Sequence, residues 1–198
     1  MAKKIKLIVL FGEAGSGKDT CLHQVCSVMG DRIHEIISST TRPPRQGEKD
    51  GVNYHFLSFD EYNDKIKNNQ FLETSSFRGW YYGTTLDELD PDKVNIGVFN
   101  PTGIKSISEK IDIIDPVYVW IQASPKNRLL RQLNREKNPD CDEIIRRYET
   151  DKKDFAPYYY GTAPVSGISI INNDYLDVAE ICKPIVSIAL NFEQDKTD

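Results

Sequence analysis

The stretch GEAGSGKDT occupies residues 12–20 and directly follows the apolar run IKLIVLF at residues 5–11. It nearly matches the phosphate-binding pattern G-x-x-x-x-G-K-[ST], with Gly12, Gly17 and Lys18 in register. A continuous apolar run of this kind is typical of a strand buried on both faces of a parallel sheet. A strand, a glycine loop and a helix in this order favour a nucleoside triphosphate site, with a glycine turn that binds nothing as the alternative.

One residue of this loop is unusual. A Ser or Thr hydroxyl that contacts Mg²⁺ normally follows the lysine, whereas this chain has Asp19. A carboxylate oxygen is also a hard ligand that suits Mg²⁺, so Asp19 is a candidate metal ligand. Backbone N–H groups, the dipole of the next helix and the Lys18 ammonium would hold the triphosphate. The loop residues assigned to this site are Gly12, Glu13, Ala14, Gly15, Ser16, Gly17, Lys18, Asp19 and Thr20.

The composition is typical of a globular chain. Its 198 residues are 39% hydrophobic and 28% charged, which predicts one domain with a sizeable core. A formal net charge of −5 argues against general binding to nucleic acid or to an anionic membrane. The first apolar run is short and no small-residue cleavage site follows it. The four cysteines show neither metal-site nor disulfide-dense spacing, so we predict a reduced, cytoplasmic protein.

Apolar periodicity and turn residues divide the chain into alternating strands and helices. We predict strands at residues 5–11, 34–40, 71–79, 80–85, 94–99, 117–122 and 167–171. We predict helices at residues 19–29, 58–69, 125–137, 140–155 and 176–192, and another that begins near Pro101. Ser58 and Glu61 have the spacing of a capping box. The alternation predicts an α/β fold with a doubly wound parallel sheet flanked by helices.

A second candidate site lies in the run TTRPPRQGEKDGVNYHF at residues 40–56. Two prolines limit the conformations of the segment that carries Arg42 and Arg45, and Tyr54 follows. Two guanidinium groups and a phenol can bind one phosphate dianion through several hydrogen bonds. A solvated charged loop is the alternative, and the rigid prolines make it the weaker one.

Together these residues resemble the guanylate kinase family of ATP-dependent nucleoside monophosphate kinases. The similar segments are the glycine loop, the TTRPPRxGE run and the later stretches FLETSSFRGWYYGT, RLLRQLNRE, IIRRYE and NDYLDVA. The resemblance implies a P-loop NTPase fold that phosphorylates GMP or dGMP with ATP and Mg²⁺. It also implies a core at residues 1–38, 89–123 and 157–192, an inserted monophosphate-binding lobe at 39–88 and a lid at 124–156.

The resemblance assigns site residues position by position. The residues expected at GMP are Ser38, Arg42, Arg45, Tyr54, Glu73, Tyr82, Thr84 and Asn100. Arg131, Arg135 and Arg147 match arginines of the lid, with Arg146 an equal candidate for the last, and Asn173 matches a residue near the ATP adenine. The expected catalytic residues are Lys18, Arg45, Arg135 and Arg147. Placement and charge neutralisation dominate phosphoryl transfer, which agrees with a site rich in arginine.

The chemistry of Glu73 suits guanine independently of the resemblance. Guanine presents N1–H and N2–H₂ donors that one ionised carboxylate can accept, whereas the lone pair at adenine N1 would repel it. Asn100 stands where the family has an acid that assists guanine recognition, and Val98 stands where it usually has another Asp. A neutral amide at Asn100 predicts weaker discrimination, and Asp19 is a possible replacement for the carboxylate lost at Val98.

Two alternative functions remain at this point. A kinase of the same fold could accept another substrate, such as a broad range of deoxynucleoside monophosphates or a ribose bisphosphate. A non-catalytic module could use the monophosphate site for phosphopeptides, although the retained glycine loop argues against it. Aromatic runs at residues 80–82 and 158–160 lack a neighbouring basic stripe, so we predict no nucleic-acid partner. The sequence does not define the oligomeric state.

Overall fold

The computed structural model describes residues 3–45, 47–135, 137–173 and 177–194. Its main sheet has five strands, all parallel, in the order β2-β7-β1-β8-β9. The predicted parallel core sheet is therefore confirmed. The strands of this sheet are β1 (Ile5–Phe11), β2 (Ile33–Glu35), β7 (Val94–Val98), β8 (Ile114–Gln122) and β9 (Ile168–Ile171).

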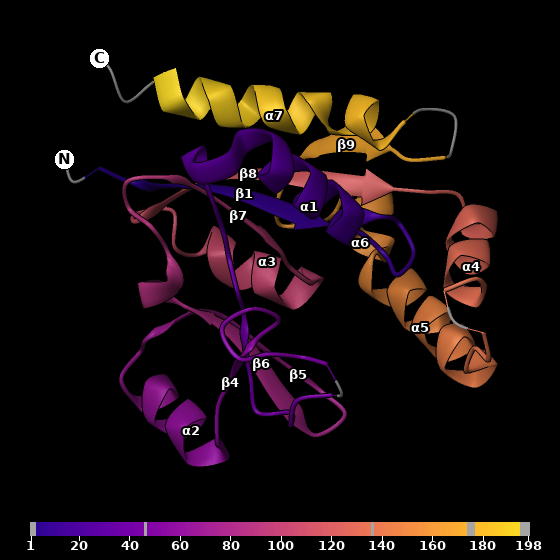
Figure 1. Cartoon of the computed structure of the whole chain (residues 1–198), viewed down its shortest axis with the longest axis horizontal. Coiled ribbons are helices and arrows are strands. Elements are labelled where there is room, and N and C mark those ends of the chain that lie inside the picture. The colour runs from indigo at the N-terminus through magenta and orange to yellow at the C-terminus, as the bar shows by residue number, and fades with distance from the viewer. Residues whose placement is uncertain (1–2, 46, 136, 174–176, 195–198) are drawn as a thin grey trace.

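Helices cover both faces of the main sheet because alternate residues of β1 point to opposite sides. Ile8 and Leu10 pack in a cluster with α1 (Lys18–Met29) and α7 (Val178–Gln194). Leu7, Val9 and Phe11 pack in a second cluster with α3 (Pro101–Ser108). Figure 1 shows α1 and α7 above the sheet and α3 below it.

A smaller sheet lies below the main one, in the order β4-β3-β6-β5 (Figure 1). Its strands are β3 (Ser39–Thr40), β4 (His55–Phe56), β5 (Phe71–Phe77) and β6 (Trp80–Thr85). Helix α2 (Phe59–Lys67) packs against it through Tyr62, whose hydroxyl donates to Tyr82 O at 2.9 Å. The predicted capping box is confirmed, because Ser58 and Glu61 exchange hydrogen bonds at the start of α2.

The remaining helices lie beside the carboxyl ends of the parallel strands, on the right of Figure 1. They are α4 (Pro125–Leu133), α5 (Cys141–Asp154) and α6 (Ala156–Tyr159). Two 3₁₀ helices, η1 (Gly30–Arg32) and η2 (Leu86–Glu88), complete the described elements. The helix predicted at 125–137 is too long, since α4 ends at Leu133 with Asn134 as its C-cap. Strand β8 begins three residues earlier than predicted.

The single strand predicted at residues 34–40 is wrong. Strand β2 ends at Glu35 in the main sheet, and β3 begins at Ser39 in the small sheet. The ladder ends with Ile36 N, which donates to Ile96 O, and the next amide, Ile37 N, donates to the Glu88 carboxylate. An apolar run does not reveal this change of sheet, since Glu88 lies 51 residues away in the sequence.

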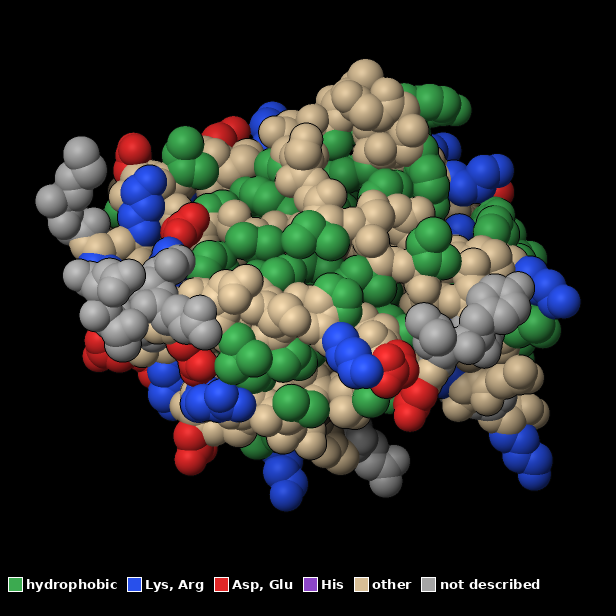
Figure 2. Space-filling model, turned by 90° about the horizontal axis from the view of Figure 1, so that it is seen from above, with side chains coloured by type: hydrophobic (Ala, Val, Ile, Leu, Met, Phe, Trp, Pro, Cys, Tyr) green, Lys and Arg blue, Asp and Glu red, His purple; other side chains and the backbone are tan. Residues whose placement is uncertain are grey.

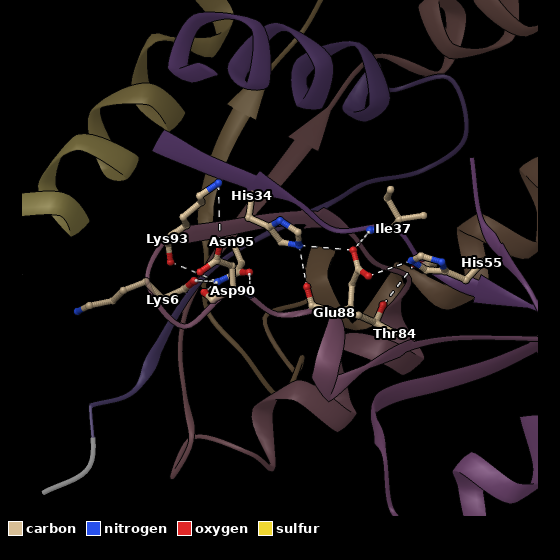
Figure 3. A network of polar contacts seen from close by, with 10 residues as sticks. Lys6, His34, Ile37, His55, Thr84, Glu88, Asp90, Lys93 and Asn95 are labelled. Carbon is tan, nitrogen blue, oxygen red and sulfur yellow. Dashed lines mark hydrogen bonds and ion pairs between the residues drawn. The ribbon is translucent and has the colours of Figure 1, made fainter. Parts of the chain in front are cut away.

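Glu88 also ties together the two crossings of the chain between the sheets (Figure 3). Its Oε1 accepts from Ile37 N at 2.9 Å, and its Oε2 accepts from His55 Nε2 at 2.9 Å. His34 Nε2 donates to the Glu88 carbonyl oxygen at 2.7 Å. One residue therefore links the segment that leaves β2, the strand β4 and the segment that returns to the main sheet after β6.

Within the described residues, no helix combines the length and apolar character needed to cross a bilayer. On the face seen from above, the Lys and Arg side chains that are coloured are scattered and form no continuous patch (Figure 2). All four cysteines are free thiols.

Candidate active site

The glycine loop joins β1 to α1 and has the backbone of an anion-binding loop. Gly15 and Gly17 have φ of 78° and 93°, in the left-handed region that favours glycine. A Cβ at Gly17 would lie 2.4 Å from Asn172 Nδ2, so a side chain cannot fit there. Gly17 is the N-cap of α1 and provides no side-chain cap, which leaves the first N–H groups of the helix to an anion.

Arg131 braces the outer side of this loop from α4. Its Nη1 donates to Gly15 O and Ser16 O at 3.2 Å each, and its Nη2 donates to Asn172 O and Oδ1. Asn172 Nδ2 donates to Ser16 O at 2.9 Å. These contacts satisfy carbonyl groups that have no partner in a helix or sheet. Arg131 was predicted at the ATP site, and the structure places it on the backbone of the loop.

A buried ionic cluster that sequence reasoning missed lies beside the loop. Glu13 is only 2% exposed, and its Oε1 accepts from the Tyr159 hydroxyl at 2.6 Å and lies 3.3 Å from Arg128 Nη1. Asp151 Oδ2 accepts from Ala14 N at 2.7 Å and lies 3.9 Å from Arg128 Nη1. Burial is the main cause that raises the pKa of Asp151 above its ordinary value. The side chain of Glu13 thus belongs to this cluster rather than to the phosphate nest.

Lys18 and Asp19 lie at the start of α1. Their side chains are 4.0 Å apart, from Lys18 Nζ to Asp19 Oδ2, and Asp19 is 73% exposed. Thr20 is also exposed. Among the described residues, no group of three or more His, Cys, Asp or Glu side chains could hold a metal ion by itself. Asp19 fits Mg²⁺ only in the way that ion usually binds, through one or two carboxylates together with substrate phosphates.

The small sheet carries a cationic site built on Arg42. The Arg42 guanidinium lies 5.5 Å from the centre of the Tyr54 ring, and its Nη2 donates to Glu48 Oε1 at 3.0 Å. Hydrogen bonding to Glu48, with a smaller contribution from Tyr82, raises the pKa of Arg42. Glu48 Oε2 also accepts from the backbone N–H of Arg45, whose side chain is exposed. Glu48 was not assigned a role from the sequence, although it is the last residue of the TTRPPRxGE run.

Tyr54 packs beside Arg42 in this cationic site. Its ring meets that of Tyr82 edge-on, with centroids 6.0 Å apart. Burial raises the pKa of Tyr54, and the nearby Tyr82 and Asp19 raise it further. Asp19 at the start of α1 is therefore within electrostatic reach of Tyr54, so the two predicted anion sites are neighbours.

The residues predicted to bind guanine, called the base pocket below, are centred on Glu73, which lies between β5 and α3. It is 8% exposed and pairs across the sheet with Thr84, whose hydroxyl lies 3.3 Å from Ser38 Oγ. Burial raises the pKa of Glu73 to about 7, although hydrogen bonds from Thr84 oppose the shift. A Cβ at Gly103 would lie 2.8 Å from Glu73 Oε2, so only glycine leaves room for the carboxylate. The structure thus brings together Ser38, Glu73 and Thr84.

Asn100 lies near Glu73, but its side-chain oxygen is already used as a helix cap. Asn100 Oδ1 accepts from Gly103 N at 2.8 Å and caps the N-terminus of α3. This local bond has the spacing of a common helix cap. Asn100 therefore holds Gly103 beside Glu73, and the predicted guanine acceptor is already hydrogen-bonded.

Glu143 binds two of the arginines predicted for the lid, Arg146 and Arg147. Arg146 donates two hydrogen bonds to Glu143 and Arg147 Nε donates one at 2.7 Å. Arg78, at the β5–β6 turn, is paired with the same carboxylate. The hydrogen bond from Arg146 is the first of several interactions that lower the pKa of Glu143 to about 2. Arg135 is exposed beyond the end of α4.

Comparison with known proteins identifies the family. A family model described as guanylate kinase matches residues 4–187. The chain belongs to the guanylate kinase family. It is 30% identical over 190 residues to a guanylate kinase of Schizosaccharomyces pombe, covering 95% of this chain and 92% of that protein. It is 31% identical over 192 residues to one of Fusobacterium nucleatum, covering 93% of this chain and 96% of that protein.

A solved structure shows the same fold. The crystal structure of guanylate kinase from Anaplasma phagocytophilum matches with a TM-score of 0.60 and 18% identity. The match covers 98% of this chain and 88% of that chain. The P-loop fold predicted from the sequence is thereby confirmed.

Val98, which departs from the pattern of the guanylate kinase family, and Asn173, which matches it, lie near the carboxyl edge of the main sheet. Val98 ends β7, pairs in register with Leu10 and packs on the apolar core. Asn173 Oδ1 accepts from Ser124 N at 2.7 Å and so connects the end of β9 to the start of α4. The rest of the NDYLDVA segment lies partly outside the described residues, since 174–176 are not described.

Proposed function

We propose that this chain transfers the terminal phosphoryl group of ATP to GMP or dGMP. One observation carries the proposal: a P-loop and a cationic site built on Arg42 are neighbours, with Asp19 of α1 within electrostatic reach of Tyr54. The buried Glu73 lies beyond the cationic site on the same small sheet. A donor and an acceptor nucleotide bound to these sites would meet at their phosphates. Family membership supports this reading.

The donor would bind along the loop at the start of α1. Backbone N–H groups would hold its phosphates, and Lys18 would reach the β- and γ-phosphates. We assign Mg²⁺ to Asp19 together with the donor phosphates, and the ion would neutralise phosphate charge there. Arg131 supports the loop from behind, through the carbonyl groups of Gly15 and Ser16.

The acceptor would bind to the small sheet. Arg42, Tyr54 and Tyr82 would hold its phosphate, with the Arg45 side chain turning inward to join them. Ionised Glu73 would accept N1–H and N2–H₂ of guanine, with Ser38 and Thr84 as neighbouring hydroxyl contacts. An adenine in this pocket would leave the buried carboxylate facing a lone pair, which is strongly unfavourable.

The reaction also needs a change in the position of the lid arginines. Arg147 is hydrogen-bonded to Glu143, so its role on the transferring phosphoryl group requires it to leave that carboxylate. We therefore assign Lys18, Arg45, Arg135 and Arg147 to charge neutralisation in the closed state. The division into a core, a lobe at 39–88 and a lid at 124–156 is part of this proposal, as is a cytoplasmic location.

An acceptor panel tests the proposal. Formation of ADP from Mg²⁺-ATP would be measured with GMP, dGMP, AMP, IMP and UMP, for the wild type, Glu73→Gln and the control Glu109→Gln. Glu109 is an exposed carboxylate at the end of α3, so its variant matches the change in charge. We expect turnover with GMP or dGMP alone, loss of guanine preference in Glu73→Gln, and no change in Glu109→Gln. Equal rates with all five acceptors would contradict the assignment of Glu73, and no turnover would contradict the function.

A further inference from the structure

Helix α5 places a carboxylate on the donor loop. Asp151 Oδ2 accepts a hydrogen bond from Ala14 N at 2.7 Å, although the two residues are 137 positions apart. Backbone amides of such a loop are the groups that bind phosphate oxygens. The Asp151 carboxylate therefore occupies a backbone amide of the loop that could otherwise bind a phosphate oxygen.

The cluster around Asp151 is incompletely satisfied. Arg128, which is 3% exposed, faces the carboxylates of both Glu13 and Asp151. Within the described part of the chain, Glu13 Oε2 and Arg128 Nε and Nη1 have no hydrogen-bond partner. Tyr159 donates to the other oxygen of Glu13. A buried polar network with unmet hydrogen bonds is weakly held, which suits a contact that is exchanged for another during function.

Lys18 connects this cluster to the donor nucleotide. The lysine of a P-loop reaches the β- and γ-phosphates, and Lys18 acts electrostatically on Asp151. A γ-phosphate beside Lys18 would therefore approach the Asp151 carboxylate as a like charge. Asp151 is only 19% exposed, so water screens this repulsion incompletely. ADP lacks the third phosphate and would meet less repulsion.

We propose that Asp151 sets the affinity for the donor by occupying the Ala14 amide until the terminal phosphate of a nucleoside triphosphate displaces it. The inference rests on the proposed function for the identity of the donor. It adds that the Asp151 side chain leaves the Ala14 amide when ATP binds, and that Asp151 weakens the binding of ATP more than that of ADP.

The test compares two nucleotides and two variants. Asp151→Asn keeps an oxygen that can accept from Ala14 N and removes only the charge. Glu149→Gln removes the same charge from a side chain of α5 that is 57% exposed, and serves as the matched control. Dissociation constants for Mg²⁺-ATP and Mg²⁺-ADP would be measured by titration calorimetry. We expect Asp151→Asn to tighten ATP roughly tenfold and ADP less than about twofold, and Glu149→Gln to change neither.

Equal tightening of ATP and ADP, no tightening, or weaker ATP binding in Asp151→Asn would overturn the inference. A melting curve would accompany each titration, and Asp151→Ser would replace Asp151→Asn if that variant does not fold. Turnover of GMP by the same wild-type sample separates the two proposals. A wild type that binds no ATP rejects the proposed function. If the wild type is active but Asp151→Asn does not tighten ATP more than ADP, only the role of Asp151 is rejected.

Discussion

Replacing Glu73 by Gln measures how much the buried charge of Glu73 destabilises the ligand-free protein. The carboxylate is nearly fully buried, and burial raises its pKa from 4.5 to about 7. Between these two values the folded protein keeps a proton that the unfolded chain has released. The free energy of unfolding therefore falls as the pH rises from about 4.5 to about 7, and levels off above that range. Gln carries no charge, so the stability of Glu73→Gln should not show this fall with rising pH.

The shift in pKa sets the size of the effect. A shift from 4.5 to about 7 corresponds to about 3 kcal/mol. Glu73→Gln should thus be more stable than the wild type by up to about 3 kcal/mol at pH 8, and by less than about 1 kcal/mol at pH 5. For a chain of this size the difference at pH 8 is roughly 6 to 12 °C in Tm.

Thermal unfolding of both proteins without nucleotide, at several pH values from 5 to 8, measures this difference. The binding of GMP should have the opposite pH dependence and become stronger as the pH rises. Ionised Glu73 binds guanine, so KM for GMP should fall about tenfold from pH 6 to pH 8 as the competent fraction grows. The GMP phosphate also titrates near pH 6 and adds its own pH dependence to KM. Glu73→Gln should keep the pH dependence that comes from the phosphate and lose the part that comes from Glu73.

A Tm difference that is the same at pH 5 and pH 8 would refute the reasoning, because it would show that the charge of Glu73 is not the cause. A wild-type KM for GMP with the same pH dependence as the variant would refute the functional half. The stability result stands without any assumption about the substrate.

Three other substitutions address the site and its support. Gly17→Ala places a Cβ 2.4 Å from Asn172 Nδ2 at a φ of 93°, so it should lower stability by roughly 1 to 3 kcal/mol and impair ATP binding; an unchanged Tm would contradict this packing. Glu48→Gln removes the charged partner of Arg42 and should raise KM for GMP roughly threefold to tenfold with less effect on kcat, which steady-state kinetics can test. Tyr62→Phe removes the hydrogen bond to Tyr82 O and should lower stability by about 1 kcal/mol in urea unfolding, whereas a neutral result would assign the role of Tyr62 to its ring alone.

Features encoded within a short stretch could be predicted from the sequence. The strand, glycine loop and helix at the start of the chain are contiguous, and their apolar period and glycines define them locally. The capping box at Ser58 and Glu61 is likewise a contact between near neighbours. The pocket residues Ser38, Glu73 and Thr84 were predicted through resemblance to a family, because only the fold brings them together.

Features that depend on distant contacts could not be predicted. The switch between sheets after Glu35 is accompanied by a hydrogen bond from Ile37 N to Glu88, and an apolar run gives no sign of it. Arg128 and Asp151 resembled ordinary charged residues of two surface helices, since their spacing on those helices carries no motif. Their burial depends on how α4 and α5 pack beside the glycine loop, which is a property of the tertiary fold.

The missing side chain at Gly103 bears on how this scaffold could be re-engineered. The first turn of α3 and the base pocket touch there with no room to spare, since a single added carbon would lie 2.8 Å from Glu73 Oε2. The position of the Glu73 carboxylate is thus set from α3, by a residue that has no side chain of its own. Any side chain introduced at position 103 would push that carboxylate aside, so a change of size there would also change the hydrogen bonds offered to a base.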